Sequence, residues 1–301
     1  MYTSSDSQLA WFKVAHQTGI GRSAVRLVPT DADGRMDAQA LQQALRDDMA
    51  HGSRPVMVVA TAGTTGAGMI DPLRACAQAA HEAGAWFHVD AAWGGALICS
   101  DRLRACLDGI EAADSVTIDA HKWFATTMGC GMFLTRHEHV LADTFRVETG
   151  YMHSNNPGLD PYVTSVQWSR RFLGLRLFLS LAAAGWDGYA SHVEHAIALA
   201  EHLRARLAAD GWRIVNESPL AVVCAEPPDG YPPARLIVRE VVASGHAWIS
   251  TTVFGGRDVV RMCITNGRTT VNDVNVLVDT LQGNGRRPQH AGRDRQMHHQ
   301  A

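Results

Sequence analysis

The sequence has very little lysine: of its 27 basic residues, two are lysines, Lys13 and Lys122, and the rest are arginines. Arginine replaces lysine wherever a positive charge on a long stem is enough, but a guanidinium does not deprotonate and cannot form a Schiff base. Lys122 lies in the run Asp-Ala-His-Lys-Trp that ends at Trp123. This placement beside a histidine indicates amine chemistry. The alternative is that the two lysines survived by chance in an arginine-biased composition.

Other features are also missing. The longest apolar stretch, residues 173–186, is too short and too polar to span a bilayer, so we expect no membrane partner. A net charge of −3 gives no basic footprint for nucleic acid. The first residues have neither the basic nor the apolar region of a signal peptide. Six scattered cysteines without a CxxC pair favour free thiols in a reducing, cytoplasmic compartment over disulfides or a zinc site.

The first half of the chain alternates short strands with amphipathic helices. The pattern predicts strands at residues 56–60, 86–89, 115–118 and 131–135. It predicts helices at 37–49 and from Asp71 to Gly84, with Asp71 as N-cap and Pro72 at the first helical position. Such alternation indicates an α/β fold with a parallel sheet, in which ligands bind at the carboxyl ends of the strands. Asp90 and Lys122 follow strand ends, so we expect both at that edge.

The second half has a different character. A long helix is expected from residue 166 to about 207, bent near Gly185. Strands near 212–215, 220–225, 247–254 and 259–265, with helices at 235–244 and 271–281, indicate an α+β module. We therefore expect a large domain over residues 1–175, a small C-terminal domain over 176–283, and a polar, disordered tail over 284–301.

A lysine that forms a Schiff base needs an electron sink beside it. Pyridoxal 5′-phosphate provides one when a carboxylate keeps its ring nitrogen protonated. Asp90, at the end of a predicted strand upstream of Lys122, is the candidate for that carboxylate. Its alternative role is an ordinary turn or cap. The pair predicts a pyridoxal-phosphate site.

Three motifs carry a family resemblance: HVDAAWGG at residues 88–95, DAHKW at 119–123 and ATAGTT at 60–65. They resemble the group II pyridoxal-phosphate-dependent amino-acid decarboxylases, which act on aromatic amino acids, glutamate, histidine or diaminobutyrate. The resemblance covers about residues 2–282. It implies the type I, aspartate-aminotransferase-like fold, with a mainly parallel sheet and a smaller C-terminal α+β domain. It also implies a carboxy-lyase that converts an L-amino acid to its amine and carbon dioxide, as a homodimer with the active site at the interface.

The resemblance also implies roles for single residues. Lys122 would bind the cofactor covalently and Asp90 would pair with its ring nitrogen. Ala92 would contact the ring face, and His121 would help to move protons. Thr65 would contact the cofactor or the region of the substrate carboxylate. The alternatives are a structural role for His121 and simple turn closure for Thr65.

Two further positions follow from the resemblance. Tyr151, in the Gly-, Pro- and Asn-rich stretch 150–161, matches a mobile-loop tyrosine that protonates the substrate carbon and reaches the partner's active site. A tyrosine there favours plain decarboxylation; as an alternative, Tyr151 is an ordinary loop residue. Gln8 stands where the family has a histidine stacked on the cofactor, and glutamine can cover the ring without carrying its charge. The family's phosphate-binding turn and its swapped N-terminal segment would fall upstream of residue 1.

Two other readings stay open. Another type I enzyme, of the desulfurase or aminotransferase kind, would share the His-Lys pair, but a desulfurase needs a nucleophilic cysteine on a loop, and no cysteine here matches. A truncated, non-catalytic paralogue would explain Gln8 and the absent phosphate turn. As for substrate, Trp93, Trp123 and Phe124 predict apolar surroundings, which favour an aromatic or aliphatic amino acid over glutamate.

Overall fold

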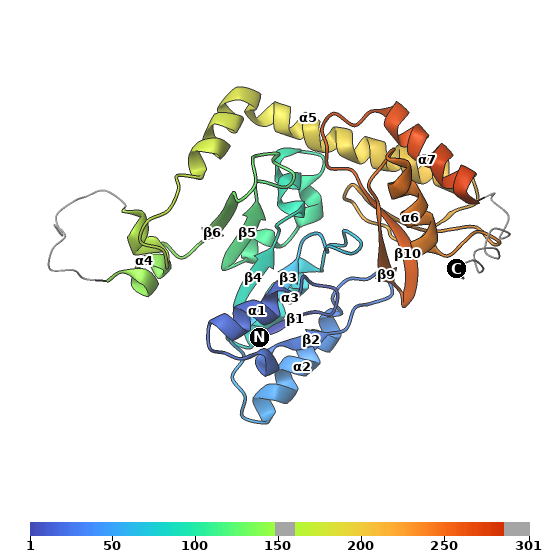
Figure 1. Ribbon diagram of the computed structural model, residues 1–301. Coiled ribbons are helices and arrows are strands. Elements are labelled where there is room, and N and C mark those ends of the chain that lie inside the picture. Colours follow the sequence, from blue (N-terminus) through green and yellow to red (C-terminus); the bar gives the residue numbers. More distant parts are fainter. Residues whose placement is uncertain (148–159, 286–301) are drawn as a thin grey trace, which may run out of the picture. The chain divides into compact units, whose positions relative to one another are not determined.

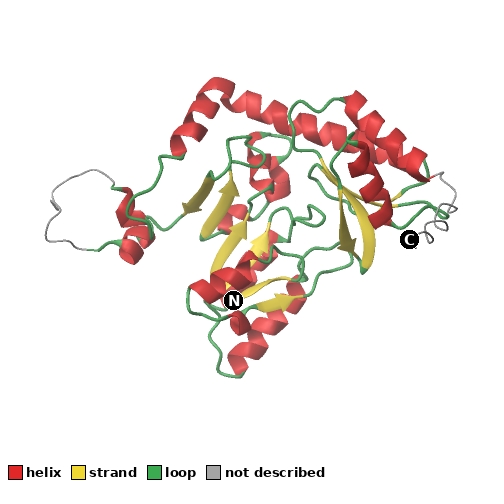
Figure 2. Ribbon diagram, in the orientation of Figure 1, coloured by secondary structure: helices red, strands yellow, loops and turns green. Residues whose placement is uncertain are grey.

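The computed structural model describes residues 1–147 and 160–285, so Tyr151 and the tail from residue 286 lie outside the described residues. The chain forms two compact units, one of residues 1–65 and 69–194, the other of residues 66–68 and 195 onward. This division falls within a long helix, later than the boundary expected after residue 175. Each unit has its own sheet (Figures 1 and 2).

The first unit is built on a six-stranded sheet in the order β2-β1-β3-β4-β5-β6. Five strands run parallel, and β6 is antiparallel to β5. The strands are β1 (Tyr2–Ser4), β2 (Arg26–Val28), β3 (Met57–Thr61), β4 (Trp86–Asp90), β5 (Ser115–Asp119) and β6 (Gly131–Thr135). The mainly parallel α/β sheet predicted from the sequence is confirmed. The central strands β3 and β4 are almost wholly buried, in agreement with their apolar runs.

The described part of the first unit also contains five helices or helix parts. They are α1 (Ala10–Gln17), α2 (Ala38–Ala50), α3 (Leu73–Glu82), α4 (Val140–Phe145) and the first part of α5 (Gly174–Ala209), with short 3-10 turns at Arg22–Ala24, Gly94–Cys99, Arg104–Leu107, Ile110–Ala112 and Pro161–Thr164. Of these helices, α2 and α3 contact the sheet. The carboxylate of Asp37 accepts hydrogen bonds from the first-turn amides of α2, which fixes where that helix begins. The inner face of α2 buries Leu41 and Leu45, as its period predicts.

Asp71 does not cap α3, contrary to the prediction. Its carboxylate instead accepts the backbone N–H of Met36 and that of Thr61, each at 2.7 Å. The side chain is 2% exposed, and burial raises the pKa of Asp71 to about 6 despite these two bonds. The sequence Asp-Pro resembles a helix start, but two tertiary backbone donors compete for the carboxylate. Asp71 thus ties the end of β3 to the turn before α2.

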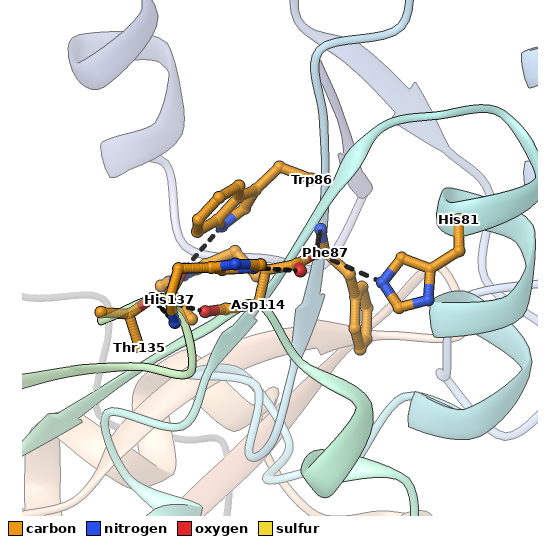
Figure 3. A network of polar contacts seen from close by, with 8 residues as sticks. His81, Trp86, Phe87, Asp114, Thr135 and His137 are labelled. Carbon is orange, nitrogen blue, oxygen red and sulfur yellow. Dashed lines mark hydrogen bonds and ion pairs between the residues drawn. The ribbon is translucent and has the colours of Figure 1, made fainter. Parts of the chain in front are cut away.

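The amino-terminal edge of the sheet carries a polar cluster around Asp114, drawn in Figure 3. One oxygen of Asp114 accepts the N–H of Phe87 at 2.7 Å and lies 3.2 Å from Nε2 of His81, and the other lies 2.7 Å from Nε2 of His137. The ring of His137 also packs on Trp86, with centroids 4.8 Å apart. The cluster joins the end of α3 to β4, β5 and the end of β6.

The second unit is α+β, as predicted. Its antiparallel sheet has the order β7-β8-β10-β9, with strands β7 (Arg213–Ile214), β8 (Val222–Glu226), β9 (Ser250–Phe254) and β10 (Arg257–Cys263), and helices α6 (Ala234–Ser244) and α7 (Val271–Gly285). The bend expected in the long helix is present, because Gly185 has φ +67° and ψ 174°, outside the helical region. No helix among the described residues is long and apolar enough to cross a membrane.

Candidate active site

The carboxyl ends of β3, β4 and β5 lie side by side and bring acidic and basic side chains together. Thr61 at the end of β3 pairs in register with Asp90 at the end of β4, which pairs with Thr117 of β5. Lys122 follows β5 by one turn, because its amide bonds the carbonyl oxygen of Asp119 at 3.0 Å. The strand ends predicted from the sequence therefore do share one edge.

The turn after β4 is fastened to β5 by backbone hydrogen bonds. The amide of Ala91 donates to the carbonyl of Thr117 at 2.9 Å, and the amide of Asp119 donates to the carbonyl of Ala92 at 3.2 Å. Gly95 lets the following 3-10 turn pack against β5, since a Cβ there would lie 2.7 Å from the side chain of Ile118. These contacts fix the backbone that carries Asp90.

The carboxylate of Asp90 is short of hydrogen-bond partners. Among the described residues its one donor is the backbone N–H of Ala92, at 3.1 Å. Burial raises the pKa of Asp90, and the nearby charge of Asp119 adds to this, against the Ala92 hydrogen bond and the positive charge of Lys122. A partly buried carboxylate with spare acceptor capacity is suited to a cationic N–H donor that comes from outside the chain.

The amine of Lys122 is accessible and has a carboxylate beside it. Its side chain is 37% exposed, and Nζ lies 3.0 Å from Oδ2 of Asp119. Asp119 was not among the site residues predicted from the sequence, although its position at a strand end, three residues before Lys122, was a usable signal. The contact places a carboxylate directly against the amine of Lys122.

His121 has a fixed ring orientation. Its Nδ1 lies 2.9 Å from the carbonyl oxygen of Cys130, which also accepts the His121 amide at 3.1 Å. Because a carbonyl only accepts, Nδ1 carries the hydrogen, and this tautomer is inferred from the hydrogen bond. Nε2 lies 3.9 Å from Oδ2 of Asp119. In the neutral ring Nε2 therefore keeps a lone pair that can accept a proton.

The other predicted residues lie farther along the same edge or outside the described part. Thr65 is exposed in the turn after β3. Gln8 is exposed after β1, and its side-chain oxygen accepts the amide of Ala10 at the start of α1. Tyr151 lies outside the described residues. The cofactor roles of Thr65, Gln8 and Tyr151 stay predictions.

Of the three aromatic residues expected around the site, Trp123 and Phe124 are core residues and Trp93 is partly buried. Trp123 is 1% exposed and stacks on Trp93 with centroids 5.2 Å apart, and Phe124 is 5% exposed and packs on Tyr189. Rings this deeply buried stabilise the loop that follows β5 and offer little surface to a ligand. The preference for an aromatic or aliphatic substrate inferred from these residues stays a prediction.

The donor set fits pyridoxal phosphate. An accessible amine on Lys122 can bind an aldehyde covalently, and the under-bonded carboxylate of Asp90 can pair with a protonated ring nitrogen. Both stand at the carboxyl edge of a parallel sheet, where α/β folds bind their ligands. With its smaller α+β unit, the molecule has the type I fold of pyridoxal-phosphate enzymes.

Comparisons with known proteins identify the family. Residues 1–226 match the model of the pyridoxal-dependent decarboxylase conserved domain. An L-2,4-diaminobutyrate decarboxylase of Acinetobacter baumannii is 34% identical over 276 residues, which are 87% of this chain and 54% of that protein. An aromatic-L-amino-acid decarboxylase of Bacillus atrophaeus is 29% identical, over 91% of this chain and 60% of that protein. The chain belongs to the pyridoxal-dependent decarboxylase family.

Solved structures agree. Mouse CSAD in its apo form matches with a TM-score of 0.87 and 30% identity, over 94% of this chain and 63% of that one. The TDC of Oryza sativa, solved with PLP and tryptamine, matches with a TM-score of 0.88 and 26% identity, over 94% and 62%. These matches confirm the predicted family and fold. The chain spans between about half and two thirds of the length of these relatives.

Proposed function

We propose that this chain acts in the pyridoxal-phosphate-dependent decarboxylation of an L-amino acid to its amine and carbon dioxide. The observation that carries the proposal is the pairing of an accessible Lys122 amine with a partly buried Asp90 carboxylate that has a single hydrogen-bond donor, at one edge of the sheet. Family membership supports the reaction class. When bound, the cofactor supplies an electron sink that accepts the electron pair left when the bond to the carboxylate breaks.

The residues of this chain would bind the cofactor and manage protons around it. Lys122 would hold the cofactor covalently. Asp119, whose Oδ2 lies 3.0 Å from Nζ, would pair with the amine of Lys122 whenever that amine is not bound to the cofactor. Asp90 would keep a proton on the ring nitrogen. His121, with Nδ1 held by the Cys130 carbonyl, would accept or donate a proton at Nε2. We propose the same kind of role for Tyr151 at the substrate carbon.

The test is release of carbon dioxide from a panel of L-amino acids by purified protein with added pyridoxal phosphate. Lys122→Ala is expected to abolish release. Lys13, the other lysine, is an exposed residue of α1, so Lys13→Ala is the matched control and is expected to retain full release. Equal release from wild type and Lys122→Ala would refute the proposal.

We further propose that the protein works as a homodimer with the active site at the interface. Large apolar side chains of the first unit stand exposed between residues 166 and 186: Val166, Trp168, Phe172, Phe178, Leu179 and Trp186. A stretch with so many exposed apolar side chains is typical of a covered surface. Sedimentation should give a dimer that Phe172→Glu with Phe178→Glu converts to monomer. A monomeric wild type would refute it.

A reducing, cytoplasmic location is also proposed, because all six cysteines are free thiols in the structure. Thiol titration of protein purified from cells without reductant should find six reactive groups after denaturation. Fewer groups, restored by reductant, would indicate disulfides and contradict this location.

A further inference from the structure

The segment between Lys122 and β6 is weakly packed on its outer side. Ala125 and residues 127–129 are exposed, and a cavity of about 460 Å³ opens beside residues 125–127, next to Arg176 and Ser180 of α5. Ala125 has φ +52°, a conformation that costs a residue with a Cβ roughly 1–2 kcal/mol. Since side-chain packing does not close this side, hydrogen bonds must hold the loop in place.

The start of α5 supplies those hydrogen bonds. Nη1 of Arg176 donates to Oγ1 of Thr127 at 2.8 Å and to the carbonyl oxygen of Met128 at 3.4 Å. One turn earlier, the carbonyl of Leu173 accepts the thiol of Cys130 at 3.7 Å. Within the described residues the guanidinium of Arg176 has no carboxylate partner within 4.0 Å, so these loop contacts are the ones that orient it.

The same loop holds the lysine and histidine of the site. Its amides bond backward into the turn, from Thr126 to the carbonyl of Ala120 and from Ala125 to that of Lys122, both at 3.1 Å. At its far end the Cys130 carbonyl accepts the ring and the amide of His121. A shift of residues 127–130 would therefore move the ring of His121 and loosen the turn that carries Lys122.

We propose that Arg176 is a positioning residue that clamps the loop of residues 125–130 and thereby fixes His121 and Lys122. The clamp itself is a property of the folded chain. Its consequence for the reaction rests on the function proposed above. Thr127 is the partner in the clamp, since its hydroxyl takes the shorter of the two bonds.

The first test needs no cofactor: hydrogen–deuterium exchange of the protein alone. Arg176→Gln should speed amide exchange in residues 122–130 about ten-fold, the equivalent of one lost charged hydrogen bond, and leave the amides around Asp114 unchanged. Arg176→Lys should restore part of the protection. Thr127→Val should act in the same direction, with little further effect when combined with Arg176→Gln. Arg102→Gln is the control, at an exposed arginine that makes no hydrogen bond or ion pair within the described residues.

Unchanged exchange in Arg176→Gln would overturn the clamp, and so would a uniform rise throughout the first unit. The second test follows the visible absorbance of added pyridoxal phosphate as a function of pH. The pH midpoint of this absorbance change should shift in Arg176→Gln, return toward the wild-type value in Arg176→Lys and stay unchanged in Arg102→Gln. An unshifted midpoint in Arg176→Gln would overturn the effect on Lys122. If wild type shows no band, the function proposed above fails, and the exchange experiment still decides the clamp.

Discussion

The two edges of the six-stranded sheet use aspartate in opposite ways. At the amino-terminal edge, Asp114 accepts a backbone amide and contacts two histidines, and these hydrogen bonds lower its pKa although burial acts to raise it. At the carboxyl edge, Asp90 has one backbone donor and a raised pKa, chiefly from burial. One carboxylate is satisfied inside the chain, and the other keeps capacity for a group that the chain does not provide.

Charged residues alone therefore do not mark the functional edge. The cluster of His81, Asp114 and His137 has the residue types of a metal site, yet the described residues contain no group of three or more such side chains placed to hold a metal. The side chains of this cluster bond to groups within the chain and so join four elements. The carboxyl edge, with an accessible amine and an under-bonded carboxylate, is the edge suited to chemistry.

The largest expected effect is on the reaction. Asp90→Asn should lower the rate of carbon dioxide release on the order of 100-fold, because an amide does not stabilise a protonated ring nitrogen. The free energy of unfolding should change by less than about 1 kcal/mol, since the charge removed is only partly buried and has a single hydrogen-bond donor. Steady-state kinetics and urea denaturation measure the two. A large loss of stability with normal activity would reverse the assignment of the edges.

Asp114→Ala should give the opposite result. It leaves the amide of Phe87, a fully buried residue, without its acceptor, which should cost about 1–3 kcal/mol of the free energy of unfolding. Covalent binding of pyridoxal phosphate should be retained, because no contact of Asp114 reaches the carboxyl edge. Denaturation and absorbance are measured on the same sample. If Asp114→Ala lost the absorbance of bound pyridoxal phosphate while its free energy of unfolding stayed that of the wild type, the cluster would serve the site.

The two carboxylates should also differ in the sign of their pH dependence. The lowered pKa of Asp114 gives stability that is present above its unfolded pKa of about 4 and is lost as the pH falls through the folded value. The raised pKa of Asp90 gives a contribution that is present below about pH 4 and is lost as the pH rises through the folded value.

Matched Asp→Asn variants, compared with wild type by urea denaturation between about pH 3 and pH 7, separate these terms. The deficit of Asp114→Asn should shrink toward acid. The relative stability of Asp90→Asn should improve as the pH rises. Slopes of the same sign for both variants would contradict the contrast between the edges.

The smallest effects are expected at the two histidines. His137→Ala should cost about 1 kcal/mol and His81→Ala less, since both side chains are nearly half exposed. His137 has the shorter contact, 2.7 Å against 3.2 Å, and it also packs on Trp86. Thermal denaturation of the two variants orders them. An effect of His81→Ala that equals or exceeds that of His137→Ala would show that these distances do not rank the contacts.

The sequence predicted the elements that have a strong local pattern. The apolar runs of β3 and β4 and the period of α2 correctly gave the sheet and its edge, and the motif around Lys122 gave the family. The short strand β2 and helix α1 were missed. Strand β2 has three residues, too few to show an alternating pattern, and helix α1 has eight residues and no side-chain cap to mark its start.

The misses at the site are tertiary in origin. Asp71 has the sequence context of a cap, but Met36, 35 residues away, and Thr61 supply competing donors. Arg176 is 49 residues from Thr127, and His137 is 23 from Asp114, so no spacing rule joins them. Asp119 was within reach of sequence reasoning, since it lies three residues before Lys122 at a strand end.

The most direct measurement is to incubate the protein with pyridoxal phosphate, reduce with borohydride and map the modified peptides by mass spectrometry. The chain has two lysines, so the outcome is a choice between them. The carboxyl-edge assignment predicts a label on Lys122 and little on Lys13, with Lys122→Ala unlabelled at that peptide. Equal labelling of both lysines, or labelling of Lys13 alone, would contradict it.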